Sequence, residues 1–571
     1  MSRTARLTPP EAAVLWALAL LVVAVAAWPL LRLAMEAVAP GGTLDSGPLR
    51  EALDSRSTWR ATRRSLETSA VGMVGAVLLG GLFAFLVALT DIRGRAALVF
   101  AFMLPMMIPP HVTALAWIQL FGPSSALLNA IGLAPPIGAP NPIYSPGGIM
   151  LLLSIQHAPL AFLVLRAAFR QVPRELVEAA RLSGAGPFGL AGRVVIPMLA
   201  PAVIAAAGLS FVSALGNFGI PALLGIPQSY YVLPTLIYRR LASFGPSVIA
   251  DAAVLALLIG LIGVIALLAQ SWLSRRMESR LTSRPGAILH VPLGRWRPAV
   301  EAGLWAIIVA ILVIPLAGLV AMSLVPAYGV GLGLSTVTLD NFAEVMFRQQ
   351  APLRAFANST GLALLAALVL AALALPLGYL QVWRGSRIAN WLTYAAEAPY
   401  ALPGVVLAIA MILVFLKPLP LLDLTLYGTL GIIFAAYLGR FFALALRPVA
   451  AGFAQADPRL DEAARLAGAG FWLRLRAVLA PLFGPMAAAG AILVFMTAFN
   501  ELTVSALLWS SGTETIGVVI FNYEDGGYSV LSSAMAVLAV VAVLVIMLAA
   551  QAARRLFPPG VLPWTDDRDG R

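Results

Sequence analysis

A nine-residue stretch occurs twice in this chain, as Glu-Ala-Ala-Arg-Leu-Ser-Gly-Ala-Gly at 178–186 and as Glu-Ala-Ala-Arg-Leu-Ala-Gly-Ala-Gly at 462–470. The two copies are 284 residues apart, and the same shift continues downstream, where Pro197 corresponds to Pro481. Self-similarity at a fixed shift is the signature of a duplicated architecture. The sequence therefore predicts two copies of one structural unit.

Prolines extend the repeat upstream. A Pro-x-x-x-Pro pair occurs at Pro105 and Pro109 and again at Pro399 and Pro403, with a shift of 294 residues. The first copy is therefore longer than the second between these two landmarks, and the uncharged, proline-rich segment 122–148 holds the extra residues. Because proline removes a backbone hydrogen bond, we predict that both helices bend at these positions.

The chain is too apolar for a soluble protein. Of its 571 residues, 60% are hydrophobic and 11% are charged, whereas soluble domains have roughly 45–50% apolar and about 25% charged residues. A helix of about 20 apolar residues crosses a bilayer, and the sequence contains twelve such stretches. We therefore predict an all-α integral membrane protein with two repeats of six transmembrane helices. The stretches are 13–34, 66–90, 96–121, 146–168, 194–225, 248–270, 299–324, 356–383, 388–416, 424–448, 477–508 and 528–552.

Basic residues set the predicted orientation, because Lys and Arg are retained on the cytoplasmic side. Most of the 38 Lys and Arg fall in segments that are cytoplasmic if the N-terminus lies inside, so we predict that both termini are cytoplasmic. The first apolar stretch is interpreted as an uncleaved helix, since it is longer than the core of a signal peptide. Six spans are an even number, so the repeats are parallel. The predicted units are 1–270 and 299–571, joined by a basic cytoplasmic linker at 271–298, and the pathway lies between them.

Each copy of the repeated stretch lies between two spans and has the signals of a short polar helix, near 173–186 and near 457–470. In the second copy, Asp457 can cap the helix, Pro458 suits its first position, and Gly468 ends it. A narrow face of small residues can enter a groove on another protein. The alternative is an amphipathic connector that lies against the chain's own surface. The residues of this face are Leu460, Ala463, Ala464 and Ala467.

The motif Glu-Ala-Ala, three residues, Gly, nine residues and an aliphatic-x-aliphatic-Pro group resembles the EAA loop of ABC importer permeases. It is complete at 178–197 and at 462–481, and departs only at Ala480, where a larger aliphatic residue is usual. In that family the loop is the coupling helix that docks on a cytoplasmic ATPase. The resemblance implies the type I ABC importer permease fold in a bacterial inner membrane, two copies of an ABC ATPase, and a periplasmic or extracytoplasmic substrate-binding protein. It assigns ATPase coupling to Glu178, Ala179, Ala180, Arg181, Gly184, Glu462, Ala463, Ala464, Arg465 and Gly468.

The composition removes most enzyme chemistries. There is no Cys, and the three His, at 111, 157 and 290, are too far apart for a local zinc motif. The single lysine, Lys417, lies in Leu-Lys-Pro and cannot complete a phosphate-binding loop. We therefore expect no cofactor or metal on this chain and no enzymatic activity, with ATP-Mg bound and hydrolysed by partner subunits. The basic charge of so apolar a chain indicates contact with membrane lipid and not with nucleic acid.

Polar groups inside the predicted spans are candidates for lining the pathway, because such groups are costly in lipid. The candidates are Asn217, Glu397, Asn500 and Glu501. The fused twelve-span form, with 499–503 and its counterpart 215–219, resembles iron(III) importer permeases, which implies iron(III) as the substrate. Thiamine, polyamines or another small solute are alternatives. A twelve-helix secondary transporter is a further alternative, favoured by the Asp-Ile-Arg-Gly-Arg loop at 91–95.

Overall fold

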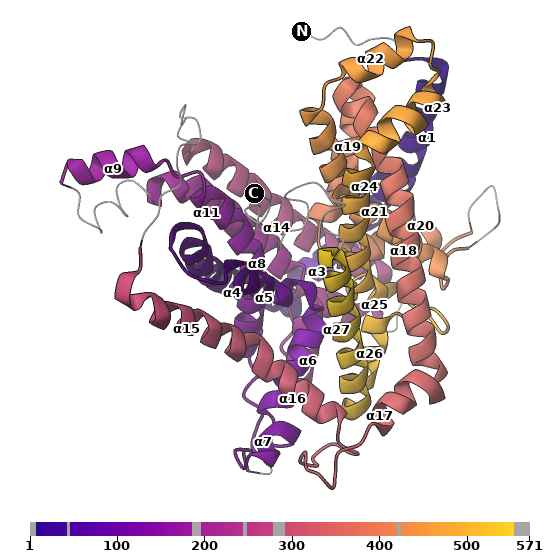
Figure 1. Cartoon of the computed structure of the whole chain (residues 1–571). Helices are drawn as coiled ribbons and strands as arrows, with labels where there is room; N and C mark the ends of the chain where they lie inside the picture. Colours follow the sequence, from indigo (N-terminus) through magenta and orange to yellow (C-terminus); the bar gives the residue numbers. More distant parts are fainter. Residues whose placement is uncertain are drawn as a thin grey trace.

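The structure is a computed structural model that describes residues 7–42, 46–136, 138–184, 196–243, 248–277, 292–418, 423 and 425–552. Every regular element in these ranges is a helix, as the composition predicts (Figure 1). The helices of the first repeat are α1 Pro9–Val22, η1 Val23–Ala27, α2 Trp28–Val38, η2 Pro40–Gly42, α3 Gly47–Asp54, α4 Arg56–Leu89, α5 Arg95–Met107, α6 Pro110–Phe121, α7 Ala126–Ala130, α8 Pro146–Phe169, α9 Arg174–Leu182, α11 Ile196–Leu215, α12 Gly219–Gly225, η4 Ile226–Gln228, α13 Leu233–Leu241 and α14 Val248–Met277.

The second repeat follows the same order after the linker. Its helices are η5 Gly294–Trp296, α15 Arg297–Ile308, η6 Val309–Val313, α16 Ile314–Ser323, α17 Asp340–Ala343, η7 Glu344–Arg348, α18 Gln350–Gly378, η8 Tyr379–Trp383, α19 Arg387–Ala401, α20 Gly404–Phe415, α21 Leu430–Gln455, α22 Arg459–Leu466, α23 Phe471–Arg474, η9 Leu475–Leu479, α24 Ala480–Phe499, α25 Ser505–Leu508, α26 Ile516–Asp525 and α27 Ser529–Ala552.

Within the described ranges, ten helices are long and apolar enough to cross a membrane, and three further pairs qualify only when each bent pair is taken together. The ten helices and two of the bent pairs correspond to the twelve predicted spans. These two pairs are α5 with α6 and α19 with α20, bent by 97° and 111°. The fold is therefore that of a multi-pass membrane protein, with the third and ninth spans broken.

Proline causes both breaks, as predicted. Ile108 and Leu402, which precede Pro109 and Pro403, have extended backbones with ψ of 134° and 152°, because proline disfavours the helical conformation of the residue before it. Each proline then starts a new helix in a different direction. The same break therefore occurs at equivalent places in the two repeats.

The predicted boundaries differ at three places. The fifth and eleventh spans end at Leu215 and Phe499, before the predicted residues 225 and 508, because short helices that run in new directions follow each of them. The sixth span, α14, continues to Met277, so the first residues of the predicted linker are helical. Residues 278–291 of that linker lie outside the described part of the chain.

The first helix of each repeat packs on the other repeat, a contact that the sequence did not predict. Helix α1 contacts α18 and α19, and the π-helical turn η1 contacts α19 and α21. In the second repeat, α16 contacts α6 and α7. Figure 1 shows α1 beside α22 and α23, far from α9 of its own repeat. The two repeats are thus interlocked, and motion of one cannot be independent of the other.

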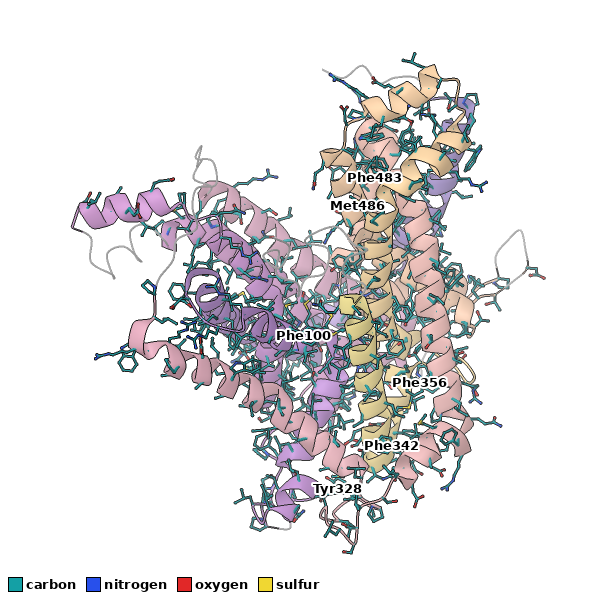
Figure 2. All side chains as sticks on the ribbon, in the orientation of Figure 1. Phe100, Tyr328, Phe342, Phe356, Phe483 and Met486 are labelled. Atoms are coloured by element: carbon teal, nitrogen blue, oxygen red, sulfur yellow. The ribbon has the colours of Figure 1, made fainter. Side chains whose placement is uncertain are left out.

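Small residues let the spans approach closely. A Cβ added to Gly80 of α4 would lie 2.4 Å from the carbonyl oxygen of Ala158 in α8, and one on Gly490 of α24 would lie 2.7 Å from the carbonyl oxygen of Ala445 in α21. Aromatic rings fill the wider gaps. Phe483, labelled with Met486 on α24 in Figure 2, stacks on Phe453 with ring centroids 3.7 Å apart. This mixture of close backbone contact and ring packing is typical of helix association in membranes.

Candidate coupling helices and translocation pathway

The second repeated stretch forms α22, which starts one residue later than predicted. Asp457 Oδ1 accepts a hydrogen bond from the backbone N–H of Arg459 at 3.0 Å, and Pro458 occupies the cap position. At the other end, Gly468 has φ of +81°, and the N–H groups of Gly468 and Ala469 donate to the carbonyls of Arg465 and Ala464. The helix thus ends at a glycine in the left-handed conformation, and the N–H groups of this glycine and the next residue pair with the last carbonyls of the helix.

The first repeated stretch forms α9 and ends in the same way, at Gly184 with φ of +82°. Glu178 and Ala179 are exposed, and Ala180 is half-buried. The side chain of Arg181 and residues 185–195 lie outside the described part of the chain. Both predicted helices therefore exist, and both end at the predicted glycine.

Both helices present an apolar surface that this chain leaves uncovered. Leu182 and its counterpart Leu466 are each 90% exposed, and Leu460 is 48% exposed. Glu462 and Ala463 are exposed, and Ala464 is half-buried. Figure 1 places α9 and α22 toward the same end of the molecule, opposite α7 and α17. Exposed leucines beside alanines on a polar helix fit a surface that another protein covers.

Arg465, to which the resemblance assigns ATPase coupling, does not point outward from α22. Its guanidinium turns back into the chain, where Nη2 lies 2.6 Å from Asp461 Oδ2 and 3.6 Å from Glu11 Oε1. Asp461 is 3% exposed and Glu11 is fully buried. The face of α22 opposite its exposed residues is therefore held by charged groups, although the sequence analysis selected neither acid as a site residue.

The two broken spans meet the ends of the fifth and eleventh spans in the interior, between the two repeats. A Cβ on Gly216, at the end of α11, would lie 3.2 Å from Cα of Pro403 at the break of the ninth span. Asn500, the equivalent residue of the second repeat, donates from Nδ2 to the carbonyl of Met107 at 2.8 Å, beside the break of the third span. Each repeat thus contacts the other at its break, in the region between the repeats where the sequence predicts the pathway.

Asn217 and Glu501 occupy equivalent positions in the two repeats, and each accepts backbone hydrogen bonds at the start of a short helix. Asn217 Oδ1 accepts from the backbone N–H of Ile220 at 3.1 Å and caps α12. Glu501 accepts from the N–H groups of Val504 and Ser505 at 2.8 Å and 3.1 Å and caps α25. Glu501 is 8% exposed. Both side chains therefore hold the start of a short helix at the centre of the molecule, where the N-terminal N–H groups need acceptors.

Two further polar residues, which sequence reasoning did not select, lie at these breaks. Gln156 of α8 donates to the carbonyls of Pro105 and Ile108 at 2.8 Å and 3.2 Å, and so satisfies the carbonyls that the break leaves without helical partners. Arg440, which is 284 residues further on, packs its guanidinium against Gly404. A comparison of polar residues at equivalent positions of the repeat would have found both.

His111 is a third such residue. It lies in the first turn of α6, is 1% exposed, and packs against Gly219 and Gly517 from both repeats. Neither ring nitrogen has a hydrogen-bond partner within the described residues. Among the described residues, the breaks are therefore flanked by the amides of Asn217, Asn500 and Gln156, the imidazole of His111, the guanidinium of Arg440 and the carboxylate of Glu501.

Comparison with known proteins agrees with this architecture. The family model described as "Binding-protein-dependent transport system inner membrane component" matches twice, at residues 76–279 and 373–562. The chain belongs to this family. It is an ABC importer permease in which two permease units are fused in one polypeptide.

Relatives that match along most of their length are also permeases. The probable ABC transporter permease protein y4fN of Sinorhizobium fredii is 29% identical over 482 residues, which cover 82% of this chain and 80% of the relative. The Fe(3+)-transport system permease protein FbpB 2 of Haemophilus influenzae is 23% identical, covering 80% and 82%. The ferric transport system permease protein FbpB of Actinobacillus pleuropneumoniae is 24% identical, covering 83% and 69%.

Glu397 of the permease makes its contact with the neighbouring span. Its Oε1 lies 3.7 Å from Arg447 Nε in α21, and the Arg447 guanidinium also lies 5.0 Å from the centre of the Tyr400 ring. Both charged side chains are about half exposed in the isolated chain, at 42% and 55%. The pair therefore joins α19 to α21, and Glu397 does not reach the centre of the molecule.

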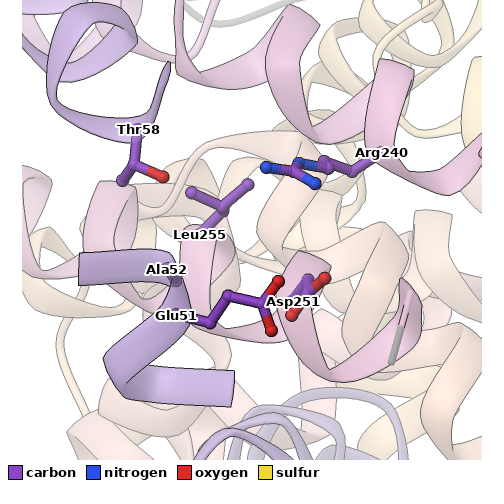
Figure 3. A pocket seen from close by; sticks show the side chains of 6 residues that line it. All are labelled: Glu51, Ala52, Thr58, Arg240, Asp251 and Leu255. Atoms are coloured by element: carbon purple, nitrogen blue, oxygen red, sulfur yellow. The ribbon is translucent and has the colours of Figure 1, made fainter. Parts of the chain in front are cut away.

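A small open hollow lies beside α3, α13 and α14 of the permease. Glu51, Asp251 and Arg240 line it, and Figure 3 shows the two carboxylates side by side below the guanidinium. Within the described ranges, no group of three or more His, Cys, Asp or Glu could hold a metal ion. Two carboxylates and one guanidinium therefore share this hollow.

Proposed function

We propose that this permease imports iron(III) across a bacterial inner membrane, with both termini in the cytoplasm. A periplasmic or other extracytoplasmic binding protein delivers the substrate. Two copies of a cytoplasmic ABC ATPase bind ATP-Mg and hydrolyse it, and the permease itself carries out no catalysis. The units 1–270 and 299–571, joined by the linker 271–298, move relative to each other to give alternating access.

The observation that carries this proposal is the pair of matched exposed helices. Helices α9 and α22 end in the same glycine geometry and leave equivalent leucines uncovered at the same end of the molecule. Two equivalent docking surfaces fit a partner that is itself a pair of subunits. Glu178 and Glu462, with the alanines that follow each, are the residues that contact the ATPases.

The ferric permeases among the relatives support iron(III) as the cargo. We propose that Asn217, Asn500 and Glu501 lie beside the pathway and keep its short helices in place at the breaks. Substrate entering there meets the amides of Asn217 and Asn500 and the carboxylate of Glu501, and Glu397 supports the ninth span through Arg447. Separate uptake measurements with ferric iron, thiamine and a polyamine distinguish the candidate cargoes.

Replacing Gly184 and Gly468 together with tryptophan tests the coupling role. No atom lies within 4 Å of a Cβ built at either position, so the new rings have room in this chain and obstruct a docked partner. Both glycines have a positive φ, so the control must carry the same backbone strain. The ATPase is expected to co-purify with the wild type and to be lost from the double variant, while membrane insertion is retained. Gly527→Trp is the matched control, because Gly527 has φ of +80° and its Cβ also meets open space. Retained ATPase and uptake in the double variant would contradict the proposal.

A further inference from the structure

A buried ionic cluster lies beneath α22, on the face opposite its exposed residues. We call it the Glu11 cluster, and its charged members come from three parts of the chain: the N-terminal helix, the end of the eighth span, and α22 with α23. Glu11 is fully buried, and Asp461 and Arg474 are each 3% exposed. The members are Glu11, Tyr379, Arg384, Asp461, Arg465 and Arg474.

Glu11 is the centre of the cluster and its one member from the first repeat. Oε1 of Glu11 accepts from Nη2 of Arg474 at 3.1 Å and lies 2.8 Å from Oη of Tyr379. Oε2 accepts from Nη2 of Arg384 at 3.0 Å and from the backbone N–H of Thr8 at 2.9 Å. Both carboxylate oxygens are therefore fully used, and each holds a group from the second repeat.

Asp461 ties α22 to the same cluster. Its Oδ1 pairs with Arg474, and its Oδ2 lies 2.6 Å from Arg465 and 3.2 Å from Oη of Tyr379. The Tyr379 ring in turn packs against Phe453. Apart from Arg465, which is 32% exposed, the charged side chains of the cluster are at most 6% exposed. Such buried, paired charges hold one geometry strongly, because removing one partner leaves the others buried and uncompensated.

The sequence provides this cluster once. At a shift of 284 residues, Asp461 corresponds to Val177 and Arg474 to Leu190. Arg384 precedes Gly385, which has a positive φ, as Arg93 precedes Gly94, which also has a positive φ, so Arg384 corresponds to Arg93. The counterparts of Asp461 and Arg474 are uncharged, so the first repeat lacks the two charged residues that link α22 and α23 to Glu11.

The first helix of the second repeat does carry an acid close to the position of Glu11. Leu-Trp-Ala at 15–17 recurs at 304–306, and Glu301 precedes the second copy. The side chain of Glu301 is 26% exposed and pairs with Arg297 and the N–H of Arg93. It therefore ties α15 to the loop between α4 and α5.

The N-terminal helix connects the Glu11 cluster to the breaks. After α1 the chain passes through η1, where Val25 packs closely on α21. A Cβ on Gly439 of α21 would lie 2.2 Å from the carbonyl oxygen of Val25. Gly439 precedes Arg440, which packs on Gly404 just after the break of the ninth span. The next helix, α2, packs along α20. A displacement of α22 that moves α1 therefore reaches the broken span through rigid, packed helices.

We propose that Glu11 is a positioning residue for transport, because it makes α22 move as one body with α1. A displacement of α22 is then transmitted to the broken ninth span more rigidly than a displacement of α9 is transmitted to the broken third span. This inference rests on the proposed coupling role of α22. It also predicts that the two ATPase contacts of the permease are unequal, although the exposed surfaces of α9 and α22 are nearly identical in sequence.

The first test measures local mobility and needs no partner. The chain has no Cys, so single spin labels can be attached at Leu466→Cys and Leu182→Cys, both of which replace leucines that are 90% exposed. Glu11→Gln is expected to shorten the rotational correlation time of the label at 466 at least twofold and to leave the label at 182 unchanged. Glu301→Gln, the matched control, is expected to change neither. Equal changes at both labels, or no change at 466, would overturn the proposal.

The second test measures coupling in the reconstituted complex with its ATPase. The Glu11→Gln variant is expected to keep its ATPase subunits bound. The stimulation of ATP hydrolysis by the ferric-loaded binding protein is expected to fall at least fivefold in this variant and to be unchanged in Glu301→Gln. Asp461→Asn replaces Glu11→Gln in both tests if the latter does not accumulate. Normal stimulation in both cluster variants would overturn the proposal. Failure of the wild type to bind any ATPase would instead refute the proposed function and leave the mobility result valid.

Discussion

Glu501 provides the sharpest test of how the permease uses its polar residues. Its carboxylate accepts from two backbone N–H groups, at 2.8 Å and 3.1 Å, at the start of α25. If the role of Glu501 is to hold this short helix, stability and transport depend on its acceptor oxygens and not on its negative charge. We therefore compare Glu501→Gln, which keeps one acceptor oxygen and the shape of the side chain, with Glu501→Ala, which keeps neither.

The magnitudes follow from the hydrogen bonds. Glu501→Ala leaves two buried N–H groups without an acceptor, each costing about 1–3 kcal/mol, so the loss in the free energy of unfolding is roughly 2–6 kcal/mol. Glu501→Gln keeps the stronger of the two bonds in neutral form and is expected to cost about 1–2 kcal/mol. Asn217→Asp, at the equivalent position, adds a carboxylate while keeping its acceptor, and is expected to be tolerated.

The assays are thermal unfolding followed by tryptophan fluorescence in detergent and substrate uptake in cells. Glu501→Gln is expected to transport at near wild-type rate with a slightly lower unfolding midpoint, while Glu501→Ala loses both stability and uptake. The opposite pattern would refute the reasoning. If Glu501→Gln unfolds like the wild type but transports nothing, the carboxylate charge contacts the cargo and the cap is incidental.

Three further predictions concern separate parts of the permease. Burial raises the pKa of Glu524 from 4.5 to about 7. The protonated Glu524 side chain therefore stabilises the fold fully below pH 4.5, and this stabilisation of about 3 kcal/mol is lost as the pH rises through about 7. Glu524→Gln should flatten this part of the curve of unfolding midpoint against pH. Gly439→Val places a Cβ 2.2 Å from the Val25 carbonyl oxygen and should lower the free energy of unfolding by about 3 kcal/mol. The monodisperse peak in size-exclusion chromatography should then be lost, whereas Gly303→Val should keep it. Gly468→Ala forces an L residue to φ of +81° at a cost of about 1 kcal/mol, which should lower the unfolding midpoint slightly without releasing the ATPase, since a methyl group there meets open space.

The sequence by itself determined the architecture of this protein, because the deciding signals are local or periodic. Long apolar stretches predict spans wherever they occur, since lipid offers no alternative partner for the backbone. The duplicated stretch at 178–186 and 462–470 showed the repeat and the helices that end at Gly184 and Gly468. Prolines at 109 and 403 set the breaks, because their effect on the preceding residue needs no tertiary partner.

The tertiary structure decided what the polar residues do, because hydrogen bonds and ion pairs depend on which helices become neighbours. Asn217 and Glu501 were selected as polar groups in apolar spans, but only the fold shows that they cap α12 and α25. Gln156 was overlooked because its partners, the carbonyls beside Pro105, are in another span. Glu11 resembled an ordinary acid in the first turn of a helix. It became the centre of a buried ionic cluster only because α1 packs on the second repeat, a contact between residues more than 360 positions apart that no local pattern encodes.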